Sequence, residues 1–167
     1  MLIVSDRLII TEFDESMIEC VHENSLDEDN RRFVPDEVFE TIEAAHQTVT
    51  YLMKCYKNDN GPFVYPVLLQ NGENIGYVQA VPLINGWEIG YHIAKGYTGN
   101  GYATEAVKAF LPIIMERLSI DKIEGLCLAE NIASKRVLEK SGFELLYSGL
   151  GDYQGDSRLI CKYRYSR

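Results

Sequence analysis

The sequence has little of several features that define common protein classes. It contains one Trp and five Pro among 167 residues, and no apolar run approaches the roughly 20 residues that a membrane helix needs. Its opening segment, MLIVSDRLII, lacks the basic start, the long apolar stretch and the small-residue cleavage site of a secretory signal. We therefore expect a cytoplasmic protein that does not contact a membrane.

Cysteine and histidine are also sparse, and their spacing forms no metal motif. The chain has four Cys and three His, with no C-x-x-C pair and no H-x-x-x-H. This spacing does not predict a zinc site, and no metal is expected. Because no secretion signal is present, reduced and mostly buried thiols are favoured over disulfides. The thiols belong to Cys20, Cys55, Cys127 and Cys161.

Basic residues are outnumbered by acidic ones. The chain has 16 Lys and Arg against 25 Asp and Glu, which gives a net charge of −9. We expect no nucleic-acid partner, because the phosphate backbone is itself negative. The basic and aromatic tail CKYRYSR alternates as a final strand does. The acidic excess is compatible with a cationic substrate, and also with a role in solubility alone.

The first third of the chain predicts one strand and two helices. RLIITEF, residues 7–13, has the alternation of a strand, and Asp14 is placed to cap a short helix after it. A second helix is predicted from Thr41 to Tyr56, where apolar residues recur at helical spacing. The polar stretch NSLDEDNRRFVPDE between them is predicted to be a loop.

The middle of the chain predicts three consecutive strands. FVYPVLL, NIGYVQAVPL and WEIGYHI are separated by Asn71-Gly72 and Asn85-Gly86. Asn-Gly is the strongest short hairpin signal, because both residues tolerate positive φ. The sequence therefore predicts an antiparallel meander.

The last part of the chain alternates helices and strands. A helix over 102–118 has a continuous apolar face, and Pro112 within it should remove one hydrogen bond and bend the helix. A strand (KIEGLCL), a short helix (NIASKRVLEKSG) and two strands (FELLYSG and SRLICKYRY) follow. The order predicts a single mixed α/β (α+β) domain over residues 1–167, with its core at about 8–165.

The stretch GYTGNGYATEA, residues 96–106, places three glycines within six residues immediately before a helix. A Walker phosphate loop does not fit, because Tyr and Ala stand where Lys and Ser or Thr are needed. A dinucleotide loop nearly fits residues 99–104, but it would follow a meander rather than open a series of βαβ units. A turn that binds nothing remains open, and so does a diphosphate site made of backbone N–H groups at a helix start.

Two longer segments resemble a known family. EIGYHIAKGYTGNGYATEAVKAFL, followed by KIEGLCLAENIASKRVLEKSGF, resembles the coenzyme A-binding core of the GNAT acetyltransferases, in the subgroup that includes the ribosomal-protein N-terminal acetyltransferases. The resemblance runs from about Leu8 to Tyr165. It implies a GNAT-like fold, a mixed and mostly antiparallel central sheet flanked by helices, with a splayed parallel strand pair at the cofactor site. It also implies transfer of an acetyl group from acetyl-CoA to a primary amine.

The resemblance assigns the glycine stretch to the diphosphate of acetyl-CoA. In the family loop Q/R-x-x-G-x-G/A, Gly101 and Ala103 match the two small positions, whereas Thr98 departs from the Gln or Arg. Because the loop acts mostly through its backbone, diphosphate binding should survive this departure. The implied amides belong to Gly99, Asn100, Gly101, Tyr102, Ala103 and Thr104.

The resemblance also places the arm of the cofactor. His92 and Ile93 occupy the splayed strand whose backbone bonds the pantetheine, and the N–H of Ile93 is the candidate donor to the developing oxyanion. Asn131 and Ser134 match positions that contact the arm near the second strand. Judged on the residues alone, Asn131 is a helix cap for NIASKRVL, and it could serve both purposes.

Two catalytic residues follow from the same resemblance. Glu88 is the candidate general base, with a cross-strand salt bridge or a solvent-facing carboxylate as the alternative. Leu138 stands where many relatives have the Tyr that acts as general acid. Ser134 is the candidate in its place and His92 a further one, unless a water serves or CoA leaves as a thiolate.

The acceptor side is implied in outline only. Its expected parts are residues 25–40, Trp87, Tyr147 and the loop over 149–157. The first segment is acidic, which fits a cationic small molecule or a protein N-terminus, although a solvated acidic loop is the simpler explanation. A homodimer paired through the final strand is a further expectation. The competing interpretations of the whole chain are a non-catalytic acyl-CoA-binding module and a nucleotide-dependent oxidoreductase.

Overall fold

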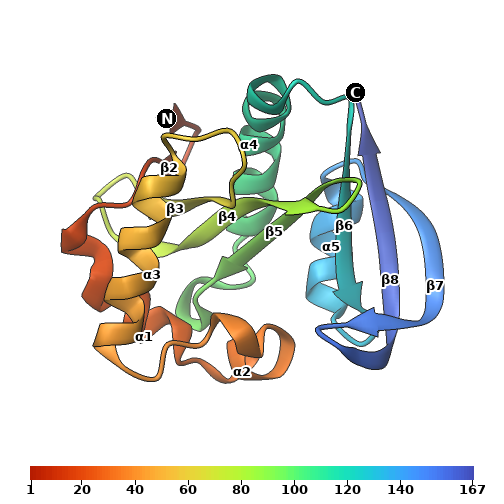
Figure 1. The fold of residues 1–167 in the computed structure, drawn as a ribbon, viewed down its shortest axis with the longest axis horizontal. Helices are drawn as coiled ribbons and strands as arrows, with labels where there is room; N and C mark the ends of the chain where they lie inside the picture. Colours follow the sequence, from red (N-terminus) through yellow and green to blue (C-terminus); the bar gives the residue numbers. More distant parts are fainter.

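The computed structural model describes all 167 residues, which form one eight-stranded sheet with helices on both faces (Figure 1). The strands are β1 Ile3–Val4, β2 Leu8–Ile10, β3 Phe63–Leu69, β4 Asn74–Leu83, β5 Gly86–Ile93, β6 Lys122–Leu128, β7 Glu144–Tyr153 and β8 Asp156–Ser166. The α-helices are α1 Ile18–Ser25, α2 Glu28–Phe33, α3 Ile42–Cys55, α4 Tyr102–Leu118 and α5 Ile132–Lys140. Short 3-10 turns lie at Glu15–Met17, Pro35–Glu37 and Lys95–Tyr97.

The strand order is β1-β2-β3-β4-β5-β6-β8-β7, and every neighbouring pair is antiparallel except β5 and β6. This confirms the predicted mixed and mostly antiparallel sheet, including the meander β3-β4-β5. The parallel pair is short, because only Glu88 with Glu124 and Ile89 with Gly125 are in register. Beyond them β5 and β6 diverge toward their carboxyl ends (Figure 1).

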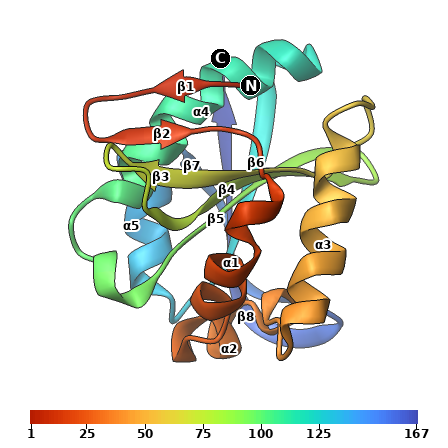
Figure 2. The same cartoon turned by 90° about the vertical axis from the view of Figure 1, so that its left-hand side faces the viewer.

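Alternation along the strands divides the core between the two faces of the sheet. Phe63, Tyr65 and Val67 of β3 belong to the larger buried cluster, which includes the apolar residues of α4. Val64 points the other way and packs with α3 residues such as Val49. Figure 2 shows α1 and α3 on one side of the central strands and α4 on the other.

Helix α4 has the predicted bounds and begins at the glycine stretch. Gly101 precedes it in the left-handed region (φ 81°), where a residue without Cβ is unstrained, and the helix ends at Ser119. Pro112 lies on the exposed side of the helix.

No α-helix is both long and apolar enough to cross a bilayer. Three of the four cysteines are buried thiols, and Cys20 is half-buried.

Three predictions about the connecting segments are wrong. The stretch 24–37 is not a simple loop, because the Asp27 carboxylate caps Asn30 N–H and starts α2. The predicted 149–157 loop is the end of the β7–β8 hairpin, which turns at Gln154 and Gly155 with positive φ. The strand predicted over 7–13 is only β2, Leu8–Ile10, because the chain leaves the sheet to reach the cap at Asp14, and the short strand β1 before it has no counterpart among the predicted elements.

Candidate active site

The glycine stretch presents a row of free backbone donors. Gly99 and Gly101 both have left-handed φ (80° and 81°), and a Cβ at Gly99 would meet nothing within 4 Å. None of the six amides from Gly99 to Thr104 donates a hydrogen bond within the chain, and the first helical bond runs from Glu105 N–H to the Gly101 carbonyl. Unpaired amides at the start of a long helix favour an anion. This is the geometry expected of a diphosphate site.

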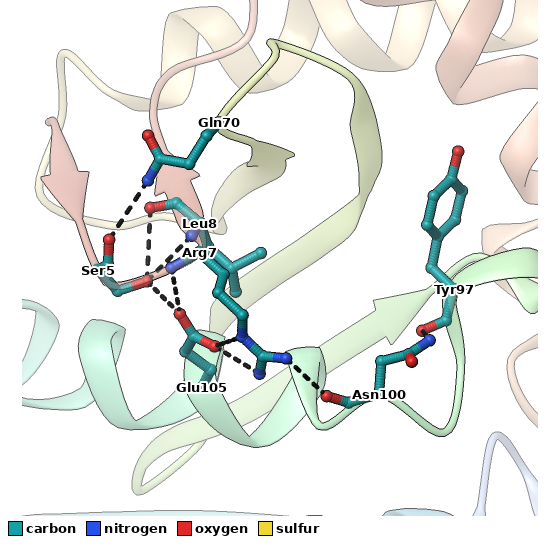
Figure 3. A network of polar contacts seen from close by, with 7 residues as sticks. All are labelled: Ser5, Arg7, Leu8, Gln70, Tyr97, Asn100 and Glu105. Carbon is teal, nitrogen blue, oxygen red and sulfur yellow. Dashed lines mark hydrogen bonds and ion pairs between the residues drawn. The ribbon is translucent and has the colours of Figure 1, made fainter.

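Side chains from the loop and from the N-terminus fix the loop in this shape (Figure 3). The Asn100 amide donates to the carbonyls of Tyr97 (3.1 Å) and Thr98 (3.2 Å). Arg7, just before β2, donates from Nη1 to the Asn100 carbonyl (2.9 Å). Asn100 therefore orients the loop through its side chain and its carbonyl, and leaves its own N–H free.

Arg7 is also paired with Glu105 in the first turn of α4. Its Nε donates to Glu105 Oε2 at 2.7 Å, and its backbone N–H donates to Oε1 at 2.9 Å (Figure 3). Ser5 Oγ adds a third bond to Oε1 at 2.8 Å. Burial alone raises the pKa of Glu105, but these bonds outweigh it, and the net pKa is lower than usual. The carboxylate is therefore held ionised and turned toward Arg7.

The free edge of β5 faces the gap between the diverging strands. Ala94 N–H donates to the Ile75 carbonyl, so His92, two residues earlier, belongs to the set that bonds β4. By the same alternation, the backbone groups of Tyr91 and Ile93 point toward the gap. The His92 side chain instead lies 3.1 Å from Asp27 Oδ2 on the face that α1 covers. Burial lowers the pKa of His92, and Asp27 opposes that shift.

The side of the gap toward α5 carries a pair of hydroxyl groups. Asn131 caps α5 by accepting from Ser134 N–H at 3.0 Å. Ser134 Oγ lies 2.9 Å from the Tyr91 hydroxyl, so β5 and α5 are joined here. Burial raises the pKa of Tyr91, and its hydroxyl stays protonated at neutral pH. Leu138 is fully buried against Gly125 and offers no polar group.

Glu88 lies where β5 and β6 begin to diverge, and its side chain is on the other face of the sheet from Ser134. On the neighbouring strand β6, Glu124 is its partner in register. Burial raises the pKa of Glu88 to about 7, Glu124 adds to the rise, and Lys162 opposes it. Glu124 has its own partner in Arg164 at 3.0 Å. A carboxyl with this pKa, without an ion pair of its own, is suited to take a proton near neutral pH.

The acidic segment expected to be solvated is partly buried against the same face. Glu37 accepts from Gln79 Nε2 at 3.0 Å, while its Oε2 has no hydrogen-bond partner and no contact with solvent. Burial raises its pKa to about 7. Gln79 is opposite Gly90, and a Cβ at Gly90 would lie 2.6 Å from the Gln79 amide. Glu37 is thus bonded to β4, the strand next to β5, on the same face of the sheet as Glu88.

The tip of the β7–β8 hairpin closes over this face. The Tyr153 hydroxyl donates to the Phe33 carbonyl, and Gln154 Nε2 donates to Asp36 Oδ1 at 2.6 Å. Trp87, expected in the acceptor pocket, lies elsewhere. It stacks on Phe63 at 5.6 Å between ring centroids, on the α4 side of the sheet, because alternation turns it away from Glu88.

Sequence reasoning missed three residues of this region. Arg7 has partners about a hundred positions away, and no local signal marks it. Tyr91 lies between Ile89 and Ile93 on the same face of β5 and so resembles an ordinary core position. In the sequence Glu37 is only one charge of an acidic segment, and its burial depends on the sheet beneath it. Tyr147 lies on β7 and is bonded within its own hairpin, to the Leu150 carbonyl at 2.7 Å.

Comparison with known proteins gives a consistent family. The acetyltransferase (GNAT) domain profile matches residues 7–144. An uncharacterized N-acetyltransferase of Bacillus subtilis (strain 168), YnaD, is 32% identical over 145 residues, which span 85% of this chain and 82% of that protein. The probable N-acetyltransferase YjcK of the same organism is 29% identical over 107 residues, which span 62% of this chain and 59% of its own length.

Solved structures share the fold over its whole length. A GNAT-family acetyltransferase from Bacillus anthracis superposes with a TM-score of 0.85 at 26% identity, covering 99% of this chain and 98% of the other. A ribosomal L7/L12 alpha-N-protein acetyltransferase (RimL), solved in complex with coenzyme A, has a TM-score of 0.84 at 22% identity and covers the same shares. The likeness to RimL, at 22% identity, shows the fold alone. The family profile and the 32% identity to YnaD show that this chain belongs to the GNAT acetyltransferase family.

Proposed function

We propose that the protein binds acetyl-CoA and transfers the acetyl group directly to a primary amine. The observation that carries this proposal is the row of six unpaired amides at the start of α4, beside a gap between parallel strands. Amides Gly99 to Thr104 would hold the diphosphate. The pantetheine arm would lie along the free edge of β5, bonded by Tyr91 and Ile93, with Asn131 and Ser134 on its other side.

In this proposal the two proton transfers take place on opposite faces of the sheet. On the Glu88 face, the carboxylate takes a proton from the ammonium, directly or through water, and frees a lone pair on nitrogen. The nitrogen attacks the thioester carbonyl and forms the C–N bond, while Ile93 N–H donates to the oxyanion. As the C–S bond breaks, the leaving thiolate takes a proton from the Ser134 hydroxyl, which is hydrogen-bonded to the Tyr91 hydroxyl.

The proposed acceptor is a cationic amine, either a small molecule or a protein N-terminus. Support comes from Glu37 and Glu88, two half-buried carboxyl groups with raised pKa near one sheet face. A positive group brought near them would offset the loss of hydration that raises both pKa values. The tip of the β7–β8 hairpin, bonded to Phe33 and Asp36, would narrow the path by which an amine reaches these carboxyl groups. A panel of small amines and short peptides, compared by kcat/KM, separates the two classes.

The test of the cofactor is isothermal titration of the protein with acetyl-CoA, with desulfo-CoA and NADP alongside. Gly101→Glu puts bulk and a negative charge into the loop, so acetyl-CoA binding is expected to be abolished. Gly72→Glu is the matched control, because Gly72 also has positive φ in a turn with open space around it. Equal loss in both variants would reduce the effect to general strain, and absence of CoA binding by the wild type would refute the proposal.

One observation favours a second function, an acyl-CoA-binding module without turnover. Leu138 is buried where many relatives have the Tyr that acts as general acid, and Ser134 supplies only a weakly acidic hydroxyl. Steady release of CoA in the presence of any amine would eliminate this alternative. Tight binding without turnover across the whole amine panel would support it.

A further inference from the structure

We propose that Arg7 is a positioning residue for the cofactor diphosphate: it holds the Glu105 carboxylate away from the free amides and anchors the loop through the Asn100 carbonyl. This rests on the proposed function, because the anion in question is the diphosphate of acetyl-CoA. Arg7 comes from the segment between β1 and β2, which belongs neither to the glycine loop nor to the diverging strands. The inference therefore extends the site to the N-terminus of the chain.

The contacts of Arg7 reach both ends of the amide row. Nη1 donates to the Asn100 carbonyl at 2.9 Å, while Nε and Nη2 lie 2.7 Å and 2.6 Å from Glu105 Oε2 (Figure 3). The guanidinium also lies over the Tyr102 ring, 4.6 Å from its centroid. One planar group thus touches a residue before α4 (Asn100), its first residue (Tyr102) and a carboxylate within its first turn (Glu105). A Lys ammonium lacks the fork that makes these contacts together.

Glu105 explains why such a group is needed. It lies in the first turn of α4, where a carboxylate is attracted to the same unpaired N–H groups that would bind a diphosphate. Left alone, its charge would repel the ligand or its oxygens would occupy the amides. In the structure these oxygens are used by Arg7 and Ser5 instead, and the Arg7–Glu105 pair carries no net charge.

The Arg7 side chain is more exposed than its partner Glu105. Its side chain is 47% exposed, whereas that of Glu105 is 18% exposed. A Cβ on Gly101 would lie 3.6 Å from Arg7 Nη2, so the guanidinium borders the loop without filling it. The arrangement leaves the positive partner the more exposed of the two, beside the loop, and the negative partner the more buried.

A double-mutant cycle tests this role, with titration of CoA and of inorganic pyrophosphate as readouts. Arg7→Gln is expected to weaken CoA binding by about tenfold or more, because Glu105 loses its partner next to the anion. Glu105→Gln alone should change affinity by less than about threefold, and adding it to Arg7→Gln should recover most of the loss. In turnover, Arg7→Gln should raise the KM for acetyl-CoA and leave kcat unchanged.

Arg31→Gln is the matched control, because Arg31 is also 47% exposed and paired with a carboxylate, Glu40, yet lies on α2. A purely structural role would lower the thermal midpoint and the fraction of binding-competent protein at unchanged Kd. Wild-type affinity in Arg7→Gln, or a double variant as weak as Arg7→Gln, would overturn the inference. If the wild type binds neither CoA nor pyrophosphate, it is the proposed function that fails.

Discussion

The proposed cofactor end and the proposed acceptor end of the candidate site are built by different means. At the cofactor end the donors are backbone amides on a loop of left-handed glycines, and side chains such as Arg7 and Asn100 only hold that loop in place. At the acceptor end the groups are side chains, above all Glu37 and Glu88, and their chemistry depends on burial.

This difference explains how each end would respond to substitution. Backbone donors keep their chemistry when side chains change, provided that the loop keeps its shape. Thr98 in place of the family's Gln or Arg illustrates this expectation, because the amide row is intact next to it. A carboxyl with a pKa near 7 depends instead on every charge around it, so a single neighbour alters its behaviour.

The largest expected effect is on the chemical step at the acceptor end. Glu88→Gln removes the proposed base, and kcat/KM at neutral pH should fall by about 100-fold. The Kd for acetyl-CoA, measured by titration, should stay within about twofold of wild type because the amide row is untouched. Glu116→Gln, on the exposed side of α4, is the control. If Glu88→Gln weakened acetyl-CoA binding as much as it lowered kcat/KM, the two ends of the site would not act independently.

An intermediate effect is expected on stability. A carboxyl whose pKa is raised to about 7 on folding, as in Glu37, stabilises the folded state below its unfolded pKa, and this contribution is lost as pH rises through 7. Glu37→Gln does not ionise. Its unfolding free energy relative to wild type should therefore rise between pH 4.5 and 7.5, by about 1–2 kcal/mol after allowance for partial exposure.

Urea denaturation at a series of pH values provides this measurement. Glu43→Gln, on the exposed face of α3, is the control and should show no such trend. A pH-independent difference between Glu37→Gln and wild type would show that folding does not raise the pKa of Glu37.

The smallest expected effect is a shift in the pH dependence of catalysis. Activity should rise with pH through about 7 as Glu88 loses its proton. Glu124→Gln removes a like charge and should move the midpoint of the kcat/KM profile to lower pH, whereas Lys162→Met removes an attraction and should move it higher. Shifts in the same direction in both variants would exclude Glu88 as the titrating group.

Most elements of the fold were predictable because their signals are local. Asn-Gly turns and apolar periodicity gave the meander, α3 and α4 at or within a residue or two of their bounds. The errors fell on segments whose structure depends on distant partners. Helix α2 is only six residues long and packs beneath the hairpin tip, through Phe33 and Tyr153. The final strand, expected at a dimer interface, already pairs with β6 on one side and β7 on the other.

By itself the sequence determined the glycine loop, the order of the longer strands and helices from β2 onward, without α2, and the resemblance to the GNAT acetyltransferases. These follow from backbone freedom, from periodicity and from residues close together in the chain. Only the tertiary structure decided that Arg7 meets Glu105, 98 positions away, and that Glu88 lies opposite Glu124. It also decided that Glu37 is withdrawn from solvent. The physical reason is that the pKa of a carboxyl and the partner of an ion pair are set by neighbours in space, which depend on how the strands pair and how the helices pack on them.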